Sequence, residues 1–156
     1  RVMAQVQQTI RSLMKARTAP PITCGAGDTV QTAVELLDRY KIGALPVTDG
    51  DGNLVGIISE RDIIRGLAEK KNDLMASPGD SLMTCEVATC TPETGIAAVA
   101  LLMDAHHIRH LPVVEAGRVI DMVSLRDLVA HRLAEAEIDA DVLREVARAS
   151  GGVSAD

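Results

Sequence analysis

One stretch of this sequence occurs twice, and that repeat limits the possible folds more than any other feature. With an offset of 66 residues, Leu45-Pro46-Val47 coincides with Leu111-Pro112-Val113, and further identities lie on both sides of this match. The match continues after a gap of one residue in the Gly/Asp-rich turn at 49–53, where an insertion costs little. Two copies predict a pseudo-symmetric pair of units, because a solenoid would need more repeats.

The apolar pattern predicts the same order of elements in each copy. A helix is followed by two short strands and a second helix, and an extended lead-in at Ile22-Thr23 or Ala88-Thr89 precedes them. The predicted first helix and two strands cover 30–37, 44–47 and 54–58 in the first copy, and 96–103, 110–114 and 119–123 in the second. Residues 70–80 are mostly polar and include Ser77-Pro78-Gly79, which predicts a linker between the copies.

Two segments outside the repeat also have helical spacing. Residues 2–14 place four aliphatic side chains on one stripe, which predicts an N-terminal helix. After the second copy the helical pattern continues through Leu133, Ala136, Ala140, Leu143 and Ala147. A helix that extends past its own unit is expected to pack on something else, such as another subunit.

Composition excludes several classes of function. The net charge is −6 and only 1% of the residues are aromatic, so we expect neither nucleic-acid binding nor an aromatic membrane belt. The longest apolar run, 95–103, is half of the roughly 20 residues that a spanning helix needs. Three cysteines are an odd number without scaffold-like spacing, which favours reduced thiols in a cytoplasmic protein.

A Ser-x-x-Asp motif follows the second strand of each copy, as Ser59 to Asp62 and Ser124 to Asp127. The motif matches a capping box, in which the serine and the acid satisfy free amides at a helix start. The same geometry suits a ligand, because a helix N-terminus attracts anions and an aspartate can accept hydrogen bonds from ribose hydroxyls. The two interpretations are compatible.

Arg109-His110 begins a strand that is otherwise apolar, whereas the first copy has Gly43-Ala44 at the same place. Either the pair is surface charge at a helix–strand junction, or it is a phosphate clamp, since Arg offers a planar fork of donors. Small residues in one copy and charged residues in the other predict that the copies are chemically unequal.

The sequence gives little support for a metal site or for catalysis. His106, His107 and His110 cluster, and Cys85 and Cys90 are five apart, but neither spacing matches a known zinc motif. Neither Ser59 nor Ser124 lies in a nucleophile elbow, and no phosphate-binding glycine loop is present. We therefore expect no enzyme activity and no metal.

With these motifs in view, the chain resembles a tandem pair of cystathionine-β-synthase (CBS) domains, the Bateman module. The resemblance covers residues 20–135 and also extends to stand-alone bacterial CBS-pair proteins. It implies an α+β fold of two β-α-β-β-α units packed sheet to sheet, with extra N- and C-terminal helices. The implied division is an N-terminal helix and lead-in (1–19), a first repeat (20–70), a linker (71–85), a second repeat (86–135) and a helical extension and tail (136–156).

The resemblance also implies a function. Such modules bind an adenine-containing regulatory ligand (AMP, ATP, NAD(H) or S-adenosylmethionine) between the repeats, often as disc-like homodimers that regulate a partner protein. Asp62 and Asp127 would hold ribose hydroxyls, with Ser59 and Ser124 beside ribose or phosphate, and Arg109 and His110 near phosphates. The remaining implied ligand contacts are Ile22, Thr23, Ile42, Gly43, Ala44, Arg61, Thr89, Ile108 and Arg126.

One departure from the family pattern concerns the second site. Asp121 stands where the family usually has glycine, and a carboxylate there would repel a phosphate. We therefore expect the Ser59/Asp62 site to be the better nucleotide site, unless Asp121 faces away or a less negative ligand is used. The alternative function is a structural or interaction module without a ligand, in which the long C-terminal helix docks a partner.

Overall fold

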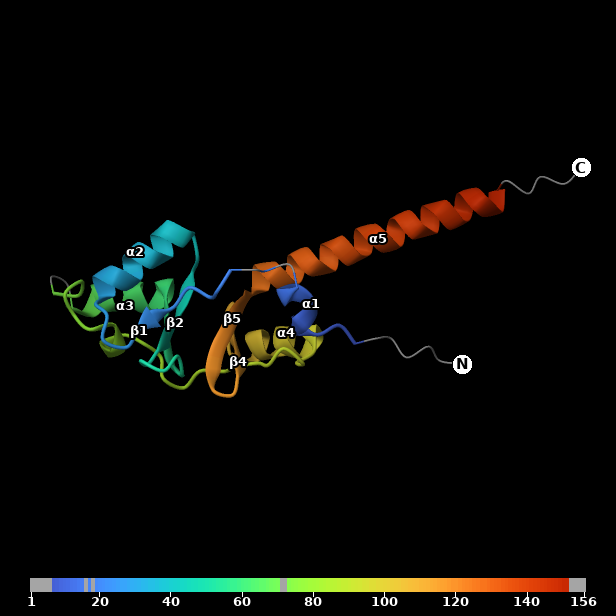
Figure 1. Cartoon of the computed structure of the whole chain (residues 1–156). Coiled ribbons are helices and arrows are strands. Elements are labelled where there is room, and N and C mark those ends of the chain that lie inside the picture. Colours follow the sequence, from blue (N-terminus) through green and yellow to red (C-terminus); the bar gives the residue numbers. More distant parts are fainter. Residues whose placement is uncertain (1–6, 16, 18, 71–72, 152–156) are drawn as a thin grey trace, which may run out of the picture.

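The computed structural model describes residues 7–15, 17, 19–70 and 73–151. Each copy forms the predicted strands and helices, so the expected α+β fold is confirmed (Figure 1). The first copy consists of β1 (Cys24–Gly25), α2 (Val30–Tyr40), β2 (Ala44–Thr48), β3 (Leu54–Ser59) and α3 (Glu60–Lys70). The second consists of α4 (Ile96–Ala105), β4 (His110–Glu115), β5 (Arg118–Ser124) and α5 (Leu125–Gly151). A short helix, α1 (Ile10–Met14), precedes the first copy, and one 3-10 turn, η1 (Gly79–Ser81), lies between the copies.

The two sheets share one pairing scheme. β2 pairs in parallel with β1 and antiparallel with β3, and β4 pairs antiparallel with β5. Cys24 pairs with Val47 in the first copy, and the equivalent bridge in the second joins Cys90 to Val113. Both copies also carry a register shift after the equivalent valine. The pseudo-symmetry predicted from the repeat therefore extends to the details of strand pairing.

The sheets lie between the helices, with α2 and α3 on one outer side and α4 on the other (Figure 1). Each copy has its own aliphatic core, in which Leu45 and the equivalent Leu111 are fully buried. The hairpin turns join the copies, because Leu54 N donates to Gly117 O at 3.2 Å and Val119 N donates to Gly52 O at 3.4 Å. Gly52 and Gly117 both have positive φ, a conformation that glycine adopts without strain.

The predicted helix over 2–14 is not continuous, because residues 7–9 are not helical and α1 begins at Ile10. The part of that prediction on residues 2–6 lies outside the described residues. The backbone of residues 8–10 forms hydrogen bonds with the segment at the start of α4: Ile96 N donates to Gln8 O and Ile10 N donates to Thr94 O, both at 2.9 Å. These bonds hold the segment against the start of α4, and Ile10 is fully buried in the core of the second copy.

The expected linker contributes to the core of the first copy. Leu74 and Leu82 are buried together with Val30 of α2, and the backbone of Val30 donates to Ser77 O at 2.9 Å. Thus the segment before the second copy packs on the first, just as the segment before the first copy packs on the second. The polar composition of 70–80 hid this role, because within that stretch only Leu74 and Met75 supply the apolar contact.

The helix α5 has 27 residues, about 40 Å at 1.5 Å per residue, and its C-terminal part projects from the body of the molecule (Figure 1). This confirms the predicted C-terminal extension. Leu128 near its start is buried, but the larger apolar residues beyond it stay exposed, including Leu133 at 61% and Leu143 at 68%. Among the described residues, no helix has the length and apolarity required to cross a bilayer.

Candidate functional site

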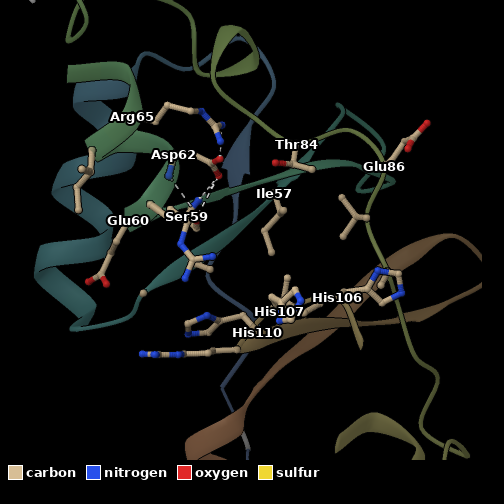
Figure 2. Close-up of a pocket in the computed structure, with 18 residues that line it drawn as sticks. Ile57, Ser59, Glu60, Asp62, Arg65, Thr84, Glu86, His106, His107 and His110 are labelled. Carbon is tan, nitrogen blue, oxygen red and sulfur yellow. Dashed lines mark hydrogen bonds and ion pairs between the residues drawn. The ribbon is translucent and has the colours of Figure 1, made fainter. Parts of the chain in front are cut away.

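A cleft of about 540 Å³ lies between the two copies, a size in the range of small-molecule sites. Figure 2 shows Ser59, Asp62 and Arg65 on one side of this cleft and His106, His107 and His110 on the other. Of the candidate ligand contacts, those that line it are Gly43, Ala44, Ser59, Arg61, Asp62, Ile108, Arg109 and His110. The cleft therefore combines the Ser-x-x-Asp motif of the first copy with the Arg-His pair of the second.

The Ser59–Asp62 motif forms the predicted capping box at the start of α3. Ser59 N donates to Asp62 Oδ2 at 2.9 Å, and Asp62 N donates to Ser59 Oγ at 3.3 Å. Ser59 Oγ also donates to Asp62 Oδ2 at 3.0 Å, and Arg65 Nη2 lies 2.6 Å from Asp62 Oδ1. Asp62 is only 5% exposed, so these bonds hold its carboxylate in one orientation at the wall of the cleft.

The opposite wall comes from the second copy, where Ile108 to His110 lead into β4. His110 approaches Gly43 closely: a Cβ at Gly43 would lie 2.9 Å from its Cε1 atom. Burial lowers the pKa of His110 below its usual value, the charges of Glu60 and Asp127 oppose this shift, and the neighbouring Arg109 adds to it. His110 is therefore neutral near pH 7 and can both donate and accept a hydrogen bond.

Gly43, the small residue of the first copy, thus leaves room for His110 of the second copy. Glu60 N donates to Gly43 O at 3.0 Å, and at the equivalent place Leu125 N donates to Arg109 O at 2.8 Å. The backbones of the two copies match here, while the side chains differ. At these equivalent positions the copies therefore contribute different side chains to this cleft, small ones from the first and charged or polar ones from the second, as the sequence predicted.

Sequence reasoning expected the backbone of Ala88 at the ligand, and Ala88 does line the cleft. It missed other lining residues as ligand contacts, namely Ile57, Glu60, Ile64, Arg65, Thr84, Glu86, Val87, His106 and His107. Arg65 had a usable signal, because it lies one helical turn after Asp62 and can reach it. Glu86 and Val87 had none, since their place depends on how the chain passes from one copy to the other.

Other predicted contacts do not line this cleft. Ile22 and Ile42 pack against the apolar core of the first copy, so neither forms a wall of it. Thr23, Thr89, Ser124, Arg126 and Asp127 are likewise absent from its lining. The lead-in that does reach the Ser59 motif is Ala88, from the second copy.

The second motif forms the same capping box but has an additional partner. Ser124 N donates to Asp127 Oδ2 at 2.8 Å, and Asp127 N donates to Ser124 Oγ at 3.2 Å. Arg17 lies against it, with its Nη2 atom 2.6 Å from Asp127 Oδ2. Burial acts to raise the pKa of Asp127, but the hydrogen bonds from Ser124 and the Arg17 guanidinium outweigh it and lower that pKa.

Within the described residues, no group of three or more His, Cys, Asp and Glu side chains is arranged to hold a metal ion. Cys24 and Cys90, which follow the lead-ins, are buried thiols. Burial raises the pKa of each to about 11. At neutral pH both are protonated, which is the unreactive form of a thiol.

Two β-α-β-β-α copies packed sheet to sheet, with a cleft built from both, form the architecture of a tandem CBS domain pair. The chain belongs to the CBS domain family, whose sequence model matches residues 10–69 and 79–134. A mitochondrial CBS domain-containing protein of Arabidopsis thaliana, CBSX3, is 33% identical over 128 residues, which cover 80% of this chain and 62% of that protein. Several other curated relatives are longer, and the chain spans between 14% and 60% of their length.

Solved structures agree with this assignment. The crystal structure of a CBS-domain containing protein from Agrobacterium tumefaciens superposes with a TM-score of 0.76 at 28% identity, over 85% of this chain and 99% of that one. The CBS domain pair of protein MJ0100 superposes with a TM-score of 0.73 at 28% identity, over 82% and 98% of the two chains. That pair was crystallised in complex with 5′-methylthioadenosine and S-adenosyl-L-methionine.

Proposed function

We propose that this chain is a non-catalytic regulatory module that binds an adenine nucleotide in the cleft between its copies. The observation that carries the proposal is the fixed carboxylate of Asp62, which faces Arg109 and His110 across one cavity. An aspartate can accept hydrogen bonds from both hydroxyls of a ribose, and arginine suits phosphate. The adenosine ligands of the MJ0100 pair support the same ligand class.

Each part of the nucleotide has a matching part of the cleft. Asp62 accepts from the ribose hydroxyls, and Arg109 and His110 donate to the phosphate. The adenine lies between the aliphatic side chains of Ile57, Val87 and Ile108, which line the cavity. Aliphatic walls bury the base by the hydrophobic effect, so the near absence of aromatic residues does not argue against adenine.

A binding role is preferred to catalysis because the one hydroxyl of the motif is already engaged. Ser59 Oγ donates to Asp62 and accepts from the amide of Asp62, as part of the helix cap. The Asp62 carboxylate that accepts from this hydroxyl also accepts from Ser59 N and pairs with Arg65, so both partners serve the start of α3. We therefore propose that the nucleotide acts as a signal and is released without having been chemically changed.

Calorimetric titration of the full chain with AMP, ATP, NAD, NADH and S-adenosylmethionine tests this function. We expect at least one to bind in the cleft, and we expect AMP to bind about tenfold more tightly than adenosine. The tenfold ratio corresponds to about 1.4 kcal/mol, the order of one charge-assisted hydrogen bond to the phosphate. Each ligand that binds should also raise the melting temperature by mass action. If none of the five binds, the proposed function is wrong.

The exposed stripe on α5 supports a second role, which is self-association. Val129, Leu133, Leu143 and the alanines at 136, 140 and 147 alternate in steps of three and four residues, the spacing of a helix-pairing seam. The occupant we propose is α5 of a second copy in antiparallel orientation. In the antiparallel register that places Ala140 against Leu143, residues 135–141, with four acids, face residues 142–148, with two arginines and one glutamate, so that opposite charges meet.

Replacement of an exposed residue in this seam should weaken the dimer without disturbing the fold. We expect Leu143→Glu, which places a charge in the seam, to raise the dimer dissociation constant at least tenfold in sedimentation equilibrium. Val142→Glu is the matched control, because Val142 is also exposed, at 53%, but lies outside the seam. Equal effects of the two variants, or a wild-type monomer at high concentration, would exclude pairing through this face.

A further inference from the structure

The aspartate of each Ser-x-x-Asp motif pairs with an arginine, but the two arginines differ. Arg65, on the same helix as Asp62, is 54% exposed and has Asp62 as its one ion-pair partner among the described residues, whereas Arg17 comes from outside the second copy and is 32% exposed. The Arg17 guanidinium bridges two carboxylates: its Nη2 atom is 2.6 Å from Asp127 Oδ2, and its Nη1 atom is 3.0 Å from Asp121 Oδ1. Nη1 also donates to the carbonyl oxygen of Met122 at 2.7 Å. One side chain from the segment between α1 and β1 thus has three acceptors on β5 and α5.

The equivalent positions of the first copy show what this arrangement replaces. Gly56 is the counterpart of Asp121, and Met83 is the counterpart of Arg17 in the repeat. Met83 lies so close to Gly56 that a Cβ there would be 2.5 Å from its Sδ atom. The first copy therefore has a glycine covered by an apolar side chain where the second has an acid paired with a base. The two replacements belong together, because each charge is paired with the other.

The exchange changes what the second motif can bind. Asp127 is the residue that matches Asp62, and its Oδ2 atom is already held by Arg17 and by the amide of Ser124. A nucleotide approaching it must displace the guanidinium, and its phosphate then meets the charge of Asp121. Three of the groups involved are partly shielded from solvent, with side-chain exposures of 32% for Arg17, 15% for Asp121 and 31% for Asp127. Salt therefore screens these interactions less than it would at an open surface.

We propose that Arg17 and Asp121 close the second site to anionic nucleotides, so that each chain binds one nucleotide, at Asp62. The inference rests on the proposed function of the first cleft. Arg17 acts as a built-in ligand: its guanidinium takes the place on Asp127 that a ribose would need. When Arg17 moves away, the negative charge of Asp121 still repels a phosphate at the second site.

The test restores the first-copy residues at both positions. We expect the wild-type chain to bind one AMP in equilibrium dialysis, and the Arg17→Met, Asp121→Gly double variant to bind two. Adding Asp62→Asn should lower each number by one, to none and to one respectively. Circular dichroism and the melting temperature establish that each variant is folded.

A second variant covers the case in which the double variant does not fold. Asp121→Asn keeps the side-chain volume and removes the charge, and we expect it to bind a second AMP more weakly than the first. If neither folded variant binds more AMP than the wild type, the inference is overturned, as it is if the wild type binds two. Absence of AMP binding to the wild type together with a single site in the double variant would overturn the first-site function and leave the closure by Arg17 standing.

Discussion

Replacing Asp62 by asparagine is expected to lower the affinity for the nucleotide about 100-fold. The carboxylate accepts two hydrogen bonds from the ribose in the proposed complex, and bonds to a charged group contribute about 1.5 kcal/mol each. Their loss amounts to about 3 kcal/mol, or roughly two factors of ten in the dissociation constant. Calorimetric titration of the Asp62→Asn variant with the best-binding nucleotide measures this change.

Asp127→Asn is the matched control for that experiment. Asp127 has the same place in the capping box of α5 as Asp62 has in that of α3. Both variants should therefore lose stability, by about 1 kcal/mol for a weakened cap. Asp62→Asn should lose far more nucleotide affinity than Asp127→Asn, because Asp127 does not line the cleft and acts on it only through the distant effect of its charge on His110. Equal losses of affinity in both variants would mean that the effect arises from weakened helix caps, and would remove Asp62 from the site.

The largest expected effect on stability comes from the central leucine of each core. Leu45 and Leu111 are equivalent in the repeat, and both are fully buried. Truncation to alanine removes apolar contacts and leaves a cavity, so either variant should lower the free energy of unfolding by about 3 kcal/mol. A domain of this size is stable by only about 5–15 kcal/mol, so the loss is a large fraction of the total. Urea unfolding followed by circular dichroism measures it.

Leu101→Ala serves as the control for these core variants. Leu101 lies on α4 in the second copy, as Leu111 lies on β4, but it is 70% exposed. Its truncation should therefore change the free energy of unfolding by less than about 0.5 kcal/mol. Similar losses in Leu45→Ala and Leu111→Ala, within one cooperative transition, are expected because the copies share hydrogen bonds and exchange core residues. A loss below 1 kcal/mol in either would contradict the core described above.

Much of the fold could be predicted because it depends on short-range patterns. The offset that aligns Leu45 with Leu111 also aligns their strands, and the Ser-x-x-Asp spacing indicated a helix start in both copies. A capping box involves residues three apart, so its geometry follows from the local sequence alone. These patterns were sufficient for the order of elements and for both caps.

The composition of the cleft depends on long-range packing, which the sequence pattern does not contain. Ala88 and Ile22 precede equivalent strands, yet only Ala88 reaches the Ser59 motif. Arg17 and Asp121 are 104 residues apart, and no local rule joins them. Asp121 was recognisable as unusual, but its partner lay in a lead-in that carried no motif. The missed residues are thus those whose place depends on how the chain crosses between copies.

The crossing itself has a consequence for how the protein is made. Ile10 completes the core of the second copy, and Leu74 and Leu82 complete that of the first. During synthesis, the segment around Ile10 leaves the ribosome long before the α4 helix against which it packs. Neither copy therefore has a complete core of its own. The first needs Leu74 and Leu82, which follow its last helix, and the second needs Ile10, which precedes the first copy. A chain that stops between the copies would lack the core into which Ile10 packs, and would also lack Leu82 and with it part of the cover of Val30, so it would expose apolar surface in two places.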